Sequence, residues 1–163
     1  MENIKDKIKS ILPENTPETT RKLKQESPYG ILLEFSEAVN EKYTNLITAR
    51  VTESIKVSQA QNDSEKQNPV FAFYLQAPIG KGYLYRLLEV EQLTNGLYPV
   101  SVKIFQNRTV PLGNNKSSKA RGRFESYDEF YSALLNFFQT SFVSNLILNL
   151  IGQVELYNES RQG

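Results

Sequence analysis

The chain has 163 residues, of which 39% are hydrophobic and 23% charged, and its formal net charge at pH 7 is +1. This length and composition are typical of one soluble globular domain. The sequence contains no cysteine and no histidine, which excludes disulfides, thiolate nucleophiles, imidazole bases and zinc sites built on either residue. It has neither a signal-peptide pattern nor an apolar run long enough to span a membrane, so we expect a cytoplasmic protein without membrane insertion.

Residues 1–27 are predicted to form an N-terminal helix and a linker. Isoleucines recur at the spacing of one helical face from Ile4 to Ile11, and Pro13 ends this helix. Within the linker, Thr16 stands directly before a proline, a pair that is typical of a helix start. The linker therefore has the pattern of a second, short and polar helix.

Residues 28–106 are predicted to form one helix followed by an antiparallel meander. Ser27 and the proline after it have the form of a helix start, and the apolar spacing stays helical to about Asn45. Beyond that residue the apolar period changes to two, which is typical of strands with one buried face. The predicted strands are residues 46–57, 70–77, 83–93 and 98–104.

The connection between the last two strands carries the clearest turn signal. Asn95-Gly96 predicts a tight hairpin, because both residue types tolerate the positive φ that such a turn requires. Pro99 cannot donate a backbone hydrogen bond, which predicts that the last strand lies at an edge of the sheet.

Residues 107–125 are predicted to be a long basic loop, because proline, glycine, asparagine and serine dominate them. Its candidate phosphate-binding residues are Arg108, Lys116, Lys119, Arg121 and Arg123, with no acidic residue among them, and the rest of the chain carries 14 basic and 18 acidic residues. The spacing is not that of a P-loop, and no aromatic residue interleaves the cations. The loop therefore has two interpretations, a phosphate-binding segment or a solvated connection.

Residues 126–152 are predicted to form the C-terminal helix, which begins with a capping box at Ser126 and ends at Gly152. The first half places large aromatic and aliphatic residues on one side. The second half has its apolar residues about 160° away around the helix axis, and these are Val143, Leu146, Ile147, Leu150 and Ile151. Either the helix bends near Thr140 so that these residues pack on the N-terminal helices, or they form a partner or dimer interface.

These patterns predict a single α+β domain over residues 1–163, with N-terminal helices, a four-stranded antiparallel meander and a long C-terminal helix packed on one face. The absence of histidine and cysteine favours a non-enzymatic protein that binds another macromolecule, either a protein partner or a second copy of itself. Immunity, inhibitor or accessory proteins of microbial conflict systems are of this kind. The alternative is a nucleic-acid or phosphate-binding protein that acts through residues 108–123. No catalytic residue, metal ligand or cofactor is predicted.

Overall fold

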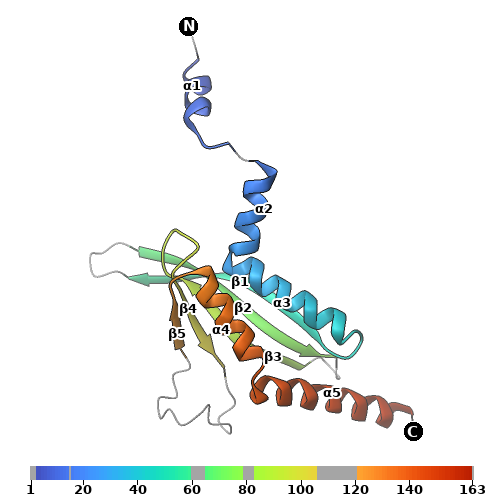
Figure 1. Ribbon diagram of the computed structural model, residues 1–163. Helices are drawn as coiled ribbons and strands as arrows, with labels where there is room; N and C mark the ends of the chain where they lie inside the picture. Colours follow the sequence, from blue (N-terminus) through green and yellow to red (C-terminus); the bar gives the residue numbers. More distant parts are fainter. Residues whose placement is uncertain (1–2, 15, 60–64, 79–82, 106–120, 163) are drawn as a thin grey trace.

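The computed structural model describes residues 3–14, 16–59, 65–78, 83–105 and 121–162 (Figure 1). In these ranges the chain is α+β, as predicted, and its antiparallel strands follow one another in the order β1-β2-β3-β4-β5. The elements are α1 (Ile4–Ile11), α2 (Pro17–Glu26), α3 (Pro28–Lys42), β1 (Thr48–Gln59), β2 (Glu65–Ala77), β3 (Tyr83–Gln92), β4 (Val100–Ile104), β5 (Arg121–Phe124), α4 (Tyr127–Phe138) and α5 (Ser141–Gln162).

The core lies between one face of the sheet and a layer formed by α3, α4 and α5 (Figure 1). The Phe138 ring of α4 lies 4.7 Å from the Phe35 ring of α3 and 5.5 Å from the Phe73 ring of β2, measured between centroids. On the same face, toward the β5 edge of the sheet, the Phe130 ring of α4 lies 6.2 Å from the Phe124 ring of β5. Aromatic pairs at these distances join the helices to the outer as well as the inner strands.

Alternation along the strands divides the sheet into a covered face and an open face. Register pairs Phe73 with Leu88, and Val90 with Val102, and all of these side chains are buried under the helices. A β-bulge between Phe73 and Tyr74 shifts the register of β2 against β3, and Leu87, beside it, is also buried. The bulge lets two consecutive leucines enter the core without reversing the rest of the strand.

The sheet has one strand more than predicted, because residues 121–124 of the expected basic loop form β5. Val100 pairs with Phe124, and Val102 with Gly122, so β4 is not an edge strand and that prediction is wrong. Pro99 precedes the first residue of β4, so its missing N–H interrupts no ladder bond.

The connections between β1 and β2 and between β3 and β4 also differ from those predicted. β1 and β2 extend into the polar segment between them, where Gln59 pairs with Glu65.

The hairpin between β3 and β4 is present, but its connection is wider than a two-residue turn, since Gln92 and Val100 are the last paired residues. Asn45 is the only non-glycine residue with positive φ in the described ranges, so Asn95 does not adopt the predicted turn conformation. The Gln92 side-chain amide instead donates to the Gly96 carbonyl at 3.1 Å.

The single helix predicted over residues 126–152 is two helices, and of the two alternatives for its apolar stripe the structure has the bend near Thr140, where α4 and α5 meet at 53°. The Thr140 hydroxyl donates to the Phe137 carbonyl at 2.6 Å, and this side-chain bond competes with the backbone ladder of a continuous helix. The predicted end at Gly152 is wrong, because α5 continues to Gln162. Val154, just beyond the glycine, is 2% exposed, and its burial offsets the cost of about 1 kcal/mol that a glycine imposes on a helix interior.

Candidate interaction surface

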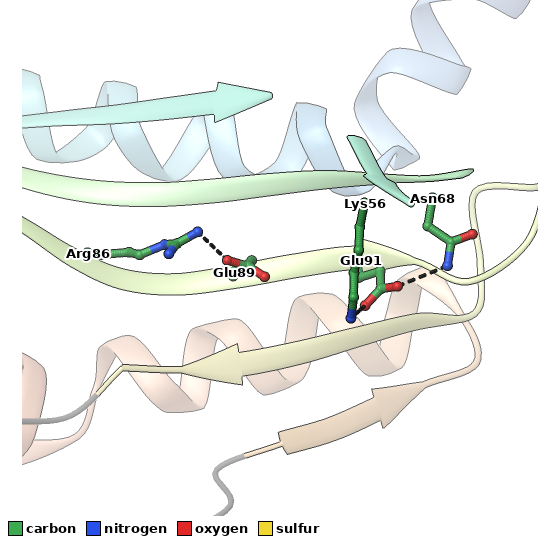
Figure 2. A network of polar contacts seen from close by, with 5 residues as sticks. All are labelled: Lys56, Asn68, Arg86, Glu89 and Glu91. Carbon is green, nitrogen blue, oxygen red and sulfur yellow. Dashed lines mark hydrogen bonds and ion pairs between the residues drawn. The ribbon is translucent and has the colours of Figure 1, made fainter. Parts of the chain in front are cut away.

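The open face is the surface of the sheet opposite the helices. Its positions alternate along the strands with those that face the helices, and Figure 2 shows five of its side chains with the helices behind the sheet. The polar and aromatic residues at open-face positions are Thr48, Arg50, Thr52, Ser54, Lys56, Ser58, Lys66, Asn68, Tyr74, Gln76, Arg86, Glu89, Glu91, Ser101, Lys103 and Arg123. No other sheet surface in the described ranges is as polar, so we take the open face as the candidate site.

A bridge of polar contacts joins three strands on the open face (Figure 2). The Glu91 carboxylate on β3 accepts a hydrogen bond of 3.1 Å from Lys56 Nζ on β1 and one of 2.9 Å from Asn68 Nδ2 on β2. Partial burial acts to raise the pKa of Glu91, but the hydrogen bonds from Asn68 and Lys56 and the charges of Lys56 and Lys66 hold that pKa below its usual value. The hydrogen bonds and the nearby lysine charges therefore keep the Glu91 carboxylate ionised.

A second group surrounds Arg86, near the opposite end of β3. The Arg86 guanidinium carbon lies 6.0 Å from the centroid of the Tyr74 ring and 4.6 Å from that of Phe105, and Arg86 also forms an ion pair with Glu89. Lys103 Nζ lies 4.9 Å from the Phe105 centroid. Both rings are half-buried, so the group presents cationic and aromatic surface together.

Cations outnumber carboxylates on the described part of the open face. The cationic side chains are Arg50, Lys56, Lys66, Arg86, Lys103 and Arg123, and the acidic ones are Glu89, Glu91 and Glu125, which pairs with Arg123 at the end of β5. Ion pairing does not withdraw the cations from solvent, since the side chains of Lys56 and Arg123 are 58% and 62% exposed in their pairs with Glu91 and Glu125. Because the whole chain has a net charge of only +1, this positive charge is concentrated on one surface.

The predicted phosphate-binding residues divide into two groups. Arg108, Lys116 and Lys119 lie outside the described residues. Arg121 and Arg123 lie on β5, where their Cα atoms pair with those of Lys103 and Ser101 on β4. The end of the basic segment is therefore continuous with the open face, next to a strand that carries a cation of its own.

The residues proposed as a partner interface on the C-terminal helix pack in or against the core of the same chain. Val143, Ile147 and Leu150 are buried, while Leu146 and Ile151 are half-buried against the same cluster. The bend between α4 and α5 turns the second half of the helix so that its stripe meets the sheet layer. The N-terminal helices α1 and α2 do not provide this cover, since neither has a buried residue.

Sequence reasoning missed Arg50, Lys66, Lys103 and the Arg86 group as site residues. The available signal was the alternation itself, because Arg50 occupies a polar position between buried Ala49 and half-buried Val51. Alternation places each cation on the wet face of its own strand, but only the strand register brings the cations of different strands together.

Among the described residues, no group of three or more acidic side chains is arranged to hold a metal ion. No single described helix is long and apolar enough to cross a membrane, and α4 and α5 meet that test only as a bent pair, by length and composition. Comparisons of the chain with protein-family models, with curated proteins and with solved structures found no match.

Proposed function

We propose that this chain is a non-enzymatic protein that binds another macromolecule through the open face of its sheet, and that the partner is a nucleic acid. The observation that carries the proposal is the excess of cations over carboxylates on this face, in a chain that is otherwise slightly acidic. Cations at such density attract a phosphate backbone and release its condensed counterions. A protein partner, which the composition favours when taken alone, would need an acidic surface to match.

The dimensions of the face support this choice. β1 and β2 have 12 and 13 residues, and at roughly 3.3 Å per residue each strand is about 40 Å long. Lys66 lies near one end of β2 and Tyr74 near the other, so the cationic surface is long enough to follow several consecutive nucleotides. The half-buried rings of Tyr74 and Phe105 offer apolar contact for bases or sugars beside the cations.

The proposal is tested by measuring the affinity of the full chain for labelled DNA and RNA oligonucleotides over a series of salt concentrations. The test variant replaces Arg50, Lys66 and Lys103 with glutamine. The matched control replaces three exposed cations on helices, Lys22, Lys42 and Arg161, and so removes the same charge elsewhere.

We expect the parent and control to bind, with an affinity that falls steeply between about 50 and 200 mM salt. The slope of log K against log salt should decrease by roughly one for each open-face cation that is lost. Absence of binding at the lowest salt, or equal loss in the control, would overturn the proposal. Capture of an acidic protein that depends on the same three cations would move the partner to the protein class.

A further inference from the structure

The first helix carries an apolar stripe that the rest of the chain does not bury. Ile4, Ile8, Ile11 and the adjoining Leu12 are 75%, 48%, 76% and 57% exposed. Helices α1 and α2 form an N-terminal arm that extends from the body of the protein (Figure 1). α1 stands at the outer end of this arm, clear of the sheet and of the other helices. Four exposed aliphatic side chains on adjacent turns differ from scattered surface residues, and a contiguous apolar patch of this kind marks a contact surface.

Charge is arranged around this stripe in a specific way. At 100° per residue, Lys5 and Lys7 lie along the two edges of the stripe, Lys9 lies next to Lys5, and Asp6 lies on the opposite side of the helix. All three lysines are exposed. A lysine at such an edge can lay its aliphatic stem along an apolar layer and keep its ammonium group in the polar layer above.

The helix is too short to be stable in water by itself. It has eight residues, and its local support consists of the Asn3 side chain, which accepts a hydrogen bond of 3.2 Å from the Lys5 N–H, and of the Ser10 hydroxyl, which donates to the Lys7 carbonyl at 2.7 Å. Isolated helices shorter than about 12 residues are marginal in water. An external apolar surface would supply the stability that α1 lacks.

The rest of the arm, residues 13–27, balances the bases Arg21, Lys22 and Lys24 with the acids Glu14, Glu18 and Glu26, so the net positive charge of the arm lies on α1. Arg21, Lys22 and Lys24 of α2 are exposed, and Arg21 and Lys24 line a hollow of about 310 Å³ with Pro17 and Thr20. The base of the arm is fixed to the body, because the Tyr98 hydroxyl donates to the Glu26 carbonyl at 2.8 Å. The arm therefore holds α1 and its lysines away from the sheet.

We propose that α1 is an interfacial helix that adsorbs to an anionic lipid bilayer, with its isoleucine stripe in the outer acyl region and its lysines among the phosphate groups. Lysines on both edges of the stripe, with the acid opposite, match a flat anionic surface. The distance of α1 from the body lets an extended plane approach without collision. One short helix supports reversible adsorption to one leaflet rather than a span, and this role is independent of the open face.

Vesicle binding tests the proposal directly. The chain has no tryptophan, so Ile8→Trp creates a single fluorescent reporter on the stripe, and Leu148→Trp creates a matched reporter on α5, where Leu148 is 64% exposed. The probes are phosphatidylcholine vesicles with and without phosphatidylserine. We expect a blue shift of the Ile8→Trp emission with the anionic vesicles alone, and no shift for Leu148→Trp.

Co-sedimentation gives a second readout without a reporter. Ile8→Glu should weaken binding to anionic vesicles by at least about tenfold, since it removes a buried aliphatic side chain from the interface. The open-face triple variant should bind vesicles as the parent does. Equal binding of Ile8→Glu and the parent, a shift of both reporters, or a shift of Ile8→Trp that depends on protein concentration without vesicles would overturn the proposal.

Discussion

The Asn68 amide on β2 donates a hydrogen bond of 2.9 Å to the Glu91 carboxylate on β3, although Asn68 itself is only 6% exposed. A buried amide and a partly buried carboxylate thus satisfy each other on a face that is otherwise cationic. Loss of either partner leaves a desolvated polar group behind, and such a group costs more than the net value of the bond.

Replacement of Asn68 by alanine should therefore lower the free energy of unfolding by about 1–2 kcal/mol at pH 7. Asn95→Ala, at an exposed position in the connection between β3 and β4, is the control and should change it by less than about 0.5 kcal/mol. Chemical denaturation measures both. A change no larger for Asn68→Ala than for the control would mean that water replaces the amide without cost.

The pH dependence of stability should contain a contribution from Glu91. The pKa of this carboxyl is lower in the folded chain than its usual value of 4.5, so the unfolded chain binds its proton first as the pH falls. The contribution is fully present above pH 4.5 and is lost as the pH falls through the lower folded value. Glu91→Gln should be less stable than the parent at pH 7, and this difference should shrink below pH 4.5. Parallel denaturation profiles for the two proteins across this range would contradict the assignment.

Two glycine-to-alanine substitutions should have opposite effects. A Cβ atom at Gly30 would lie 1.7 Å from the Lys24 carbonyl oxygen, whereas one at Gly152 would have no neighbour within 4 Å. Gly30→Ala forces α2 away from α3 and should destabilise the chain by about 1–3 kcal/mol. Gly152→Ala lies inside α5 and should stabilise it by up to about 1 kcal/mol. Thermal denaturation distinguishes the two, and a neutral Gly30→Ala would show that the junction of α2 and α3 yields easily.

The buried stripe of α5 should behave as core. Leu150→Ala should cost about 2–5 kcal/mol, because Leu150 is 2% exposed, while Leu148→Ala, at a 64% exposed position, should be close to neutral. Both values should be independent of protein concentration, since the chain covers its own stripe. If the loss of stability in Leu150→Ala depended on protein concentration, a second copy of the chain would instead cover the apolar stripe of α5.

The proposed non-enzymatic role predicts that the purified chain hydrolyses no nucleotide, ester or nucleic acid above background, with or without Mg²⁺. The physical basis is the absence of histidine and cysteine, which removes the side chains that most often transfer protons or attack as nucleophiles near neutral pH. Turnover that a single glutamate or tyrosine substitution abolishes would identify an enzyme.

The sequence by itself determined the secondary structure where local physical chemistry is strong. Ser27 accepts a hydrogen bond from the Gly30 N–H at 2.9 Å and begins α3 as its pattern indicates. Apolar alternation located β1 and β4, and the shift of the apolar stripe offered a break near Thr140 as one of two alternatives. Caps and periodicities act over a few residues, so they are readable without knowledge of the fold.

Only the tertiary structure decided how these elements combine. Residues 121–124, Arg-Gly-Arg-Phe, have no strand pattern of their own and become β5 because β4 offers an unpaired edge. The direction of the bend after α4 sends Leu150 into the core rather than to a partner. The cationic surface exists because register places Arg123, Lys103 and Arg86 on one face, and register depends on pairing between residues that are distant in the chain.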